Sequence, residues 1–121
     1  MNIEELREHC LTVKEAIECM PFDDDTMVYK IMGKMFAYFP LTPKDGRFCV
    51  TMKCHPDKSI YLREHYQGIT SGYHLNKRHW ITVYIQSDVP DKLIAELINH
   101  SVEEVTKKLP KYKRMEYQKR K

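Results

Sequence analysis

A chain of 121 residues with a net charge of +3, 42% hydrophobic and 31% charged residues, has the composition of one globular domain. It holds no run near the roughly 20 apolar residues that a membrane helix needs, and its first 20 residues carry five glutamates where a signal peptide would be basic and then apolar. We therefore expect a cytoplasmic domain that does not enter a membrane.

The charges are unevenly distributed along the chain. Residues 1–25 have a balance of −6 and residues 87–106 a balance of −4, whereas residues 26–86 carry +6 and residues 107–121 carry +7. Such asymmetry says more about binding partners than the total charge does. It favours an acidic partner for the middle of the chain.

The four cysteines, Cys10, Cys19, Cys49 and Cys54, form no C-x-x-C pair. Zinc sites usually bring their ligands together in such close pairs, and disulfides are rare inside cells. We expect reduced thiols, no metal site and no cofactor.

The first half of the sequence predicts one helix and three antiparallel strands. Asn2 followed by Glu5 is a capping-box signal, and the apolar spacing of Ile3, Leu6, Cys10, Val13 and Ile17 predicts a helix that ends before Pro21. Strands are expected over residues 26–32 and 34–39, joined at Gly33, and over residues 47–53.

The second half predicts two helices around a further strand. Pro56 and Pro90 each precede an aspartate, as at the first turn of a helix. Between them, residues 79–85 alternate, so that Ile81, Val83 and Ile85 face the core and Trp80, Thr82 and Tyr84 face the other way. The last helix runs to Pro110 with an apolar stripe formed by Ile94, Leu97, Ile98, Ser101, Val102, Val105 and Leu109. We expect one domain over residues 1–110 and a mobile basic tail over residues 111–121.

Two segments give the chain a family resemblance. HLNKRHW at residues 74–80, leading into an apolar strand and a helix, and PFDDDTMVYKIMGKMFA at residues 21–37 resemble motifs of the MmcQ/YjbR family, and the likeness runs from about residue 3 to about residue 109. The resemblance implies a frataxin-like or "double wing" α+β fold, a two-layer sandwich with helices packed on one face of an antiparallel sheet. DNA binding is the function inferred for that family.

Catalytic motifs are absent from the sequence, which has no G-x-S-x-G, no H-E-x-x-H and no P-loop. His74 and His79 are a possible acid and base pair, and Cys54 beside His55 suggests a thiol and its base. Adjacent residues on a strand or helix point apart, so we expect a protein without enzymatic activity.

The glutamates of the first helix and Asp23, Asp24 and Asp25 raise a metal alternative. In frataxins, whose fold the resemblance implies, an acidic ridge beginning on the first helix gathers iron. Hard cations do prefer clustered carboxylates, but a solvated acidic helix face is far commoner.

Nucleic-acid binding is the function that the pattern favours. The strand faces predicted to point outward carry Lys30, Lys34, Arg47 and Lys53 with Phe36, Tyr38 and Tyr84, and basic surfaces interleaved with aromatics bind phosphates and stack bases. The bend before the alternating strand adds further DNA candidates: His74, Asn76, Lys77, Arg78 and Trp80.

Structural roles remain open for the same residues. Helices would cover the face predicted to point outward if that face were in fact the core side of the sheet, and Trp80 would then be a core residue. His74 and Asn76 would serve to cap the bend by bonding its backbone. A protein-interaction module without nucleic-acid or catalytic function is the other reading.

Overall fold

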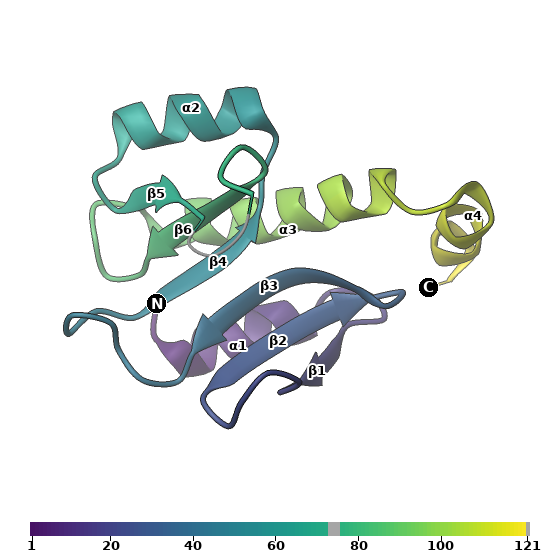
Figure 1. The fold of residues 1–121 in the computed structure, drawn as a ribbon, viewed down its shortest axis with the longest axis horizontal. Coiled ribbons are helices and arrows are strands. Elements are labelled where there is room, and N and C mark those ends of the chain that lie inside the picture. Colours follow the sequence, from purple (N-terminus) through teal and green to yellow (C-terminus); the bar gives the residue numbers. More distant parts are fainter. Residues whose placement is uncertain (73–75, 121) are drawn as a thin grey trace.

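The computed structural model describes residues 1–72 and 76–120 as an α+β fold with a six-stranded antiparallel sheet (Figure 1). The strands follow the order β1-β2-β3-β4-β6-β5 across the sheet. The elements in chain order are α1 (Ile3–Leu11), β1 (Ile17–Cys19), β2 (Thr26–Ile31), β3 (Lys34–Pro40), β4 (Cys49–Lys53), α2 (Pro56–His65), β5 (Ile69–Ser71), β6 (Trp80–Tyr84), α3 (Asp91–Lys107) and α4 (Lys111–Lys119). Within the described ranges, no helix is long and apolar enough to cross a lipid bilayer.

Helix α1 begins as predicted and ends earlier. Both bonds of the capping box between Asn2 and Glu5 are present. The Thr12 hydroxyl bonds the His9 carbonyl oxygen, and Glu15 takes a positive φ of 62°, so the chain leaves the helix. Ile17, predicted to continue the helical stripe, instead begins edge strand β1 opposite Lys30 and is 61% exposed.

The β2–β3 hairpin turns at Met32 and Gly33, whose positive φ angles of 49° and 80° are those that a two-residue hairpin loop needs to match the right-handed twist of its strands. Lys30 pairs with Met35 while Tyr29 pairs with Ala37, so Phe36 is an extra residue in β3. This β-bulge turns Phe36 into the core, where it is fully buried. The prediction that Phe36 belongs to the outward face was therefore wrong.

The sheet consists of two halves that we call the N-terminal wing (β1, β2 and β3) and the C-terminal wing (β4, β6 and β5). Strands β3 and β4 pair only at Ala37 with Met52 and at Tyr38 with Thr51. Beyond that point α3 lies between them. The buried Ser101 hydroxyl accepts a hydrogen bond from the Lys53 amide at 2.9 Å and donates one to the Phe36 carbonyl at 2.6 Å. Ser101 thus satisfies backbone groups that the separated strands cannot pair with each other.

Helices α1 and α3 cover one face of the sheet, as predicted, and lie behind it in Figure 1. The apolar stripe of α3 is buried there, with Leu97 only 1% and Val105 only 3% exposed. Ile81, Val83 and Ile85 enter the same core, as the alternation predicted. Helix α2 packs beside β5 at the far edge of the C-terminal wing.

The basic C-terminal residues, expected to form a mobile tail, instead form α4. Its anchor is Tyr117, whose side chain is 6% exposed and joins the main core. The Tyr117 hydroxyl donates to the Lys14 carbonyl oxygen at 2.9 Å, and the Lys14 ammonium lies 4.3 Å from the Tyr117 ring centroid. The Tyr117 contacts, together with the 3.2 Å ion pair from Arg120 to Glu15, dock this charged helix against a distant segment.

Candidate nucleic-acid interface

The face of the sheet opposite α1 and α3 carries Lys53 and Trp80, two of the predicted binding residues. Residues paired across a ladder share a face, so Lys53 and Trp80 lie on the same side as Thr51 and Thr82, two positions along their strands. The Thr51 and Thr82 hydroxyl groups are buried and 2.9 Å apart, which closes the middle of this face with a hydrogen bond. A hollow of about 380 Å³ lies above them, lined by Thr26, Tyr38, Pro40, Lys44, Cys49, Thr51, Thr70, Ser71, Thr82 and Tyr84.

The bend before β6 is held by its own backbone and by Asn76. The Asn76 side-chain oxygen accepts from the Arg78 amide at 3.0 Å, and the Asn76 carbonyl accepts from the His79 amide at 3.1 Å. Asn76 therefore bonds the backbone of the bend, which is the structural alternative to contacting a DNA base. His74, the other residue considered for both roles, lies outside the described residues.

Two close contacts fix the bend on the sheet. The Gly72 amide donates to the Trp80 carbonyl at 2.7 Å, and a Cβ atom at Gly72 would lie 2.6 Å from the Trp80 Cβ. Only glycine lets the backbone approach so closely. The Cys54 amide donates to the His79 carbonyl at 2.8 Å, tying the other end of the bend to the end of β4.

Lys77 and Arg78 are exposed and meet α2 across a shared hollow. The hollow measures about 270 Å³ and is lined by Pro56, Asp57, Ile60, Arg63, Ser71, Lys77 and Arg78. Arg63 is held there by a 3.2 Å hydrogen bond from its Nε to the Ser59 hydroxyl. Three cations from a bend and a helix thus surround one depression that contains a single carboxylate. Arg63 was not among the predicted residues, since nothing local marks which face of α2 meets the bend.

Lys34, Lys53 and Trp80 come together where β3 and β4 diverge. They line a hollow of about 220 Å³ with Met35, Val105 and Lys108. The Lys53 ammonium lies 6.0 Å from the Trp80 ring centroid, and Trp80 is half-buried, neither core nor fully free. Burial, with the charges of Lys108 and Lys34, lowers the pKa of Lys53. Lys108 was missed because only the path of α3 brings it to the strands.

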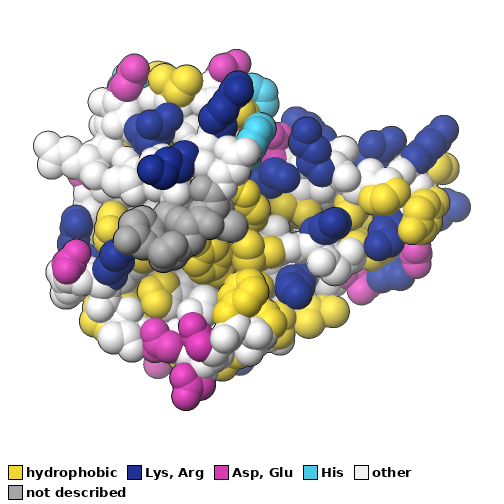
Figure 2. All heavy atoms as spheres, viewed as in Figure 1, with side chains coloured by type: hydrophobic (Ala, Val, Ile, Leu, Met, Phe, Trp, Pro, Cys, Tyr) yellow, Lys and Arg dark blue, Asp and Glu magenta, His cyan; other side chains and the backbone are white. Residues whose placement is uncertain are grey.

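The remaining predicted cations are separated from these two hollows. The Arg47 guanidinium lies 4.0 Å from the Tyr84 ring centroid and so covers one face of that ring, which removes it as a stacking surface for a base. Lys30 lies on β2, in the N-terminal wing, between Ile17 and Met35. Figure 2 shows Lys and Arg side chains gathered on the part of this face near α2, α3 and α4, while a group of acidic side chains lies at the opposite end.

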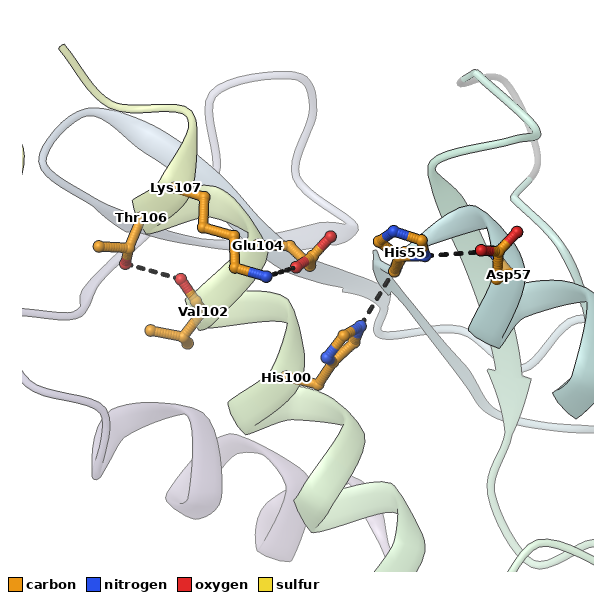
Figure 3. A network of polar contacts seen from close by, with 7 residues as sticks. All are labelled: His55, Asp57, His100, Val102, Glu104, Thr106 and Lys107. Atoms are coloured by element: carbon orange, nitrogen blue, oxygen red, sulfur yellow. Dashed lines mark hydrogen bonds and ion pairs between the residues drawn. The ribbon is translucent and has the colours of Figure 1, made fainter.

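Cys54 and His55, considered as a catalytic pair, have structural surroundings. Cys54 is 1% exposed, and burial raises its pKa to about 11, which disfavours the thiolate that a nucleophile needs. The His55 Nδ1 accepts from the Asp57 amide at the start of α2, and the His100 Nε2 accepts from the His55 amide, both at 3.2 Å (Figure 3). Burial lowers the pKa of His100.

Two of the carboxylates considered for a metal, Glu18 and Asp23, bond within the fold. Glu18 accepts from Arg7 at 2.7 Å and from the Tyr29 hydroxyl at 2.7 Å, and Asp23 accepts from the amides of Asp25 and Thr26. Among residues 1–72 and 76–120, no three His, Cys, Asp or Glu side chains converge so as to hold a metal ion.

Comparison with known proteins places this geometry in a family. A family model named YjbR matches residues 11–103. YjbR of Escherichia coli strain K12 is 30% identical over 114 residues, covering 94% of this chain and 95% of that protein. YbdF of Escherichia coli O157:H7 is 37% identical over 83 residues, covering 69% of this chain and 66% of YbdF.

Solved structures agree with the sequence relatives. The crystal structure of Deinococcus radiodurans protein DR2400, with a DUF419 domain, matches with a TM-score of 0.86 and 36% identity, covering 97% of this chain and 88% of that one. A crystal structure from Pseudomonas syringae matches with a TM-score of 0.72 and 25% identity, covering 84% and 96%. YjbR and YbdF are described as uncharacterised, so these comparisons provide a fold without an activity. The chain belongs to the YjbR family.

Proposed function

We propose that this protein binds DNA without catalysing a reaction, and that its C-terminal wing makes the contact. The observation that carries the proposal is the convergence of Arg63, Lys77 and Arg78 on one exposed hollow between α2 and the bend. Three cations with one carboxylate among them form a surface that attracts phosphates. Hydrogen bonds from the Gly72 amide to Trp80 and from the Cys54 amide to His79 tie the residues that follow Lys77 and Arg78 to the sheet, which limits the ordering required on binding.

The proposed contacts are chiefly with the DNA backbone. Lys77 and Arg78 have the chemistry for phosphates and Arg78 also for guanine, whereas the Asn76 oxygen is already used within the bend. The surface therefore favours binding that depends strongly on salt and weakly on sequence.

The test is the salt dependence of duplex DNA binding by the full chain. Changing both Lys77 and Arg78 to alanine should weaken binding and reduce the slope of log affinity against log salt by up to about two, because each phosphate contact on duplex DNA contributes roughly 0.9. The control is Lys92→Ala, at an exposed lysine on α3 that does not line the hollow. An unchanged slope in the Lys77 and Arg78 variant would overturn the proposal.

Helix α4 requires a separate control because its cations alone could hold DNA weakly. Deleting it would also remove Tyr117 from the core. Changing Lys111, Lys113 and Lys119 to glutamine removes charge and leaves that anchor. Binding by the folded wing should survive this change.

A protein partner is the second proposed function, and a different region favours it. Edge strand β1 and the segment after it expose Ile17 at 61%, Met20 at 39% and Phe22 at 67%. An apolar strand edge is a ready surface for pairing with another chain. If DNA binding fails the test above, substitution of Ile17 and Phe22 by serine should abolish any self-association or partner binding detected by sedimentation.

A further inference from the structure

The hollow at the divergence of β3 and β4 has a chemistry of its own. Its six lining residues include three lysines, one each from β3, β4 and the end of α3, and no acid. We call Lys34, Lys53 and Lys108 the lysine fork. Trp80, Met35 and Val105 form the apolar remainder of its wall.

Stabilisation of a helix end explains only one of the three lysines in the lysine fork. Lysines at the end of a helix offset the partial negative charge of its last carbonyls, which accounts for Lys108 and for its neighbour Lys107. Lys34 and Lys53 lie on strands and have no helix end to stabilise. Their shared position with Lys108 needs another explanation.

No carboxylate balances the three charges of the lysine fork. In the part of the chain that the structure describes, none of its three ammonium groups forms an ion pair. Glu104 acts on Lys53 electrostatically, but its carboxylate accepts from the Lys107 ammonium at 2.9 Å. Burial and the other two lysines lower the pKa of Lys53, as expected where like charges crowd together. An anion in the hollow would relieve this repulsion.

The volume of the hollow and the residues that line it indicate which kind of anion fits. About 220 Å³ is more than a chloride ion needs and admits a tetrahedral oxyanion with an attached organic group. Lysine ammonium groups are point charges that bind phosphate. The Trp80 ring, with Lys53 6.0 Å from its centroid, offers an apolar surface beside the charges.

We propose that the lysine fork binds a phosphate group carried by a nucleotide. As a contact for a DNA phosphodiester, this site rests on the function proposed above. As a site for a free phosphate or a nucleoside monophosphate, it does not. The bend with Lys77 and Arg78 is a separate hollow, so the two sites are separable by substitution.

Trp80 is the only tryptophan of the chain and reports on the site directly. The experiment titrates the full chain with inorganic phosphate, with deoxythymidine monophosphate and with an oligothymidylate, at constant ionic strength with chloride, and follows tryptophan emission. We expect a saturable change with each phosphate-bearing ligand and none with chloride. Lys53→Met, which keeps the aliphatic stem, should weaken the apparent affinity about tenfold, as expected for one lost charged hydrogen bond.

Substitutions at the two exposed members of the lysine fork test whether the effect of Lys53→Met comes from disturbed folding. Lys34→Gln and Lys108→Gln should each weaken the response as Lys53→Met does, whereas Lys92→Gln should leave it unchanged. An emission change that none of the three fork substitutions alters would overturn the site, as would the absence of any change.

The ligand arms separate this site from DNA binding. If phosphate and the monophosphate bind through the lysine fork but duplex DNA does not bind, the site stands and the proposed function fails. If DNA binds through Lys77 and Arg78 while neither small ligand nor oligothymidylate alters Trp80 emission, DNA binding stands and the lysine fork is refuted.

Discussion

In the N-terminal wing, charged side chains bond to the fold itself. Glu18 on β1 accepts from Arg7 of α1 and from the Tyr29 hydroxyl, joining a helix to two strands. In the C-terminal wing, Lys53, Arg63 and Arg78 form no ion pair with another described residue. The comparison teaches that the Glu18 carboxylate is used for stability, whereas these three cations remain available to a ligand.

The two wings share one helix. Helix α3 contacts both β3 and β4, and Ser101 bonds backbone groups of each. The wings should therefore differ in function while unfolding together. Four substitutions break or sharpen that comparison.

The largest effect is expected at Leu97, which is 1% exposed on the shared helix. Leu97→Ala should lower the free energy of unfolding by about 2 to 5 kcal/mol, from lost burial and the cavity left behind. Urea unfolding followed by circular dichroism and by Trp80 emission should give one midpoint. Leu11→Ala, at a side chain 41% exposed, is the control and should cost much less. Separate midpoints for the two probes would show that the wings are independent.

Ser101→Ala tests the junction of the wings. It removes the hydroxyl that bonds the Lys53 amide and the Phe36 carbonyl, two groups at the point where β3 and β4 separate. Leaving buried groups unpaired costs about 1 to 3 kcal/mol each, so we expect a loss of about 2 to 4 kcal/mol in urea unfolding. Thr106→Ala, which removes a hydroxyl bonded only within α3, is the matched control. A loss no larger than that of the control would contradict the proposed role of Ser101.

Glu18→Gln tests structural charge in the N-terminal wing. The hydrogen bond from Arg7, opposed by burial and aided by Tyr29, lowers the pKa of Glu18. Its contribution to stability is therefore present above the unfolded pKa near 4.5 and is lost as pH falls through the lower folded value. We expect a loss of about 1 kcal/mol at pH 7, since Arg7 is largely exposed. In Glu18→Gln the free energy of unfolding should also fall less steeply below pH 5 than it does in the wild type.

The control for Glu18 is Glu4→Gln, an exposed glutamate on α1, the helix that carries Arg7. It should leave both the free energy of unfolding and its pH dependence unchanged. Equal effects of the two substitutions would show that net charge, and not the bonds to Arg7 and Tyr29, stabilises this wing.

Much of the fold could be predicted because its signals are local. The capping box at Asn2, the alternation from Ile81 to Ile85 and the stripe of α3 each lie within a few residues of the element they predict. The bulge at Phe36 has no such signal, because strict alternation and an added residue look alike in one strand. Likewise, α4 depends on Tyr117 reaching a core formed by distant residues.

The candidate site divides in the same way. Alternation placed Lys53 and Trp80 on the face away from the helices, as the structure shows. It could not show that Lys34 joins them or that Arg47 covers Tyr84, because strand divergence and loop conformation decide those contacts. Arg63 and Lys108 come from helices whose packing is set by the whole fold. Local pattern therefore predicted the face, and tertiary structure selected the residues that meet on it.

The smallest effect, and the one of opposite sign, is expected at Lys53. Its pKa is lowered by burial and by Lys108 and Lys34, so the unfolded chain holds this proton more tightly than the folded one. At pH 7, below both pKa values, the charge therefore opposes folding, and stability should rise as pH increases toward 10.5. Lys53→Met removes the charge and keeps the stem, so its free energy of unfolding should equal or slightly exceed that of wild type, within about 0.5 kcal/mol.

The same variant should bind phosphate about tenfold more weakly, which separates Lys53 from Glu18. Urea unfolding of Lys53→Met beside Lys92→Met decides the point, since Lys92 is an exposed lysine on α3 away from the lysine fork. A loss of more than about 1 kcal/mol at Lys53 alone would exceed the usual range for surface changes. It would mean that the Lys53 side chain stabilises β4. The charge of Lys53 would then contribute to stability, as the charge of Glu18 does. If Lys53→Met keeps the free energy of unfolding but binds phosphate more weakly, the repulsion among the three lysines destabilises the free protein slightly and is relieved when the ligand binds.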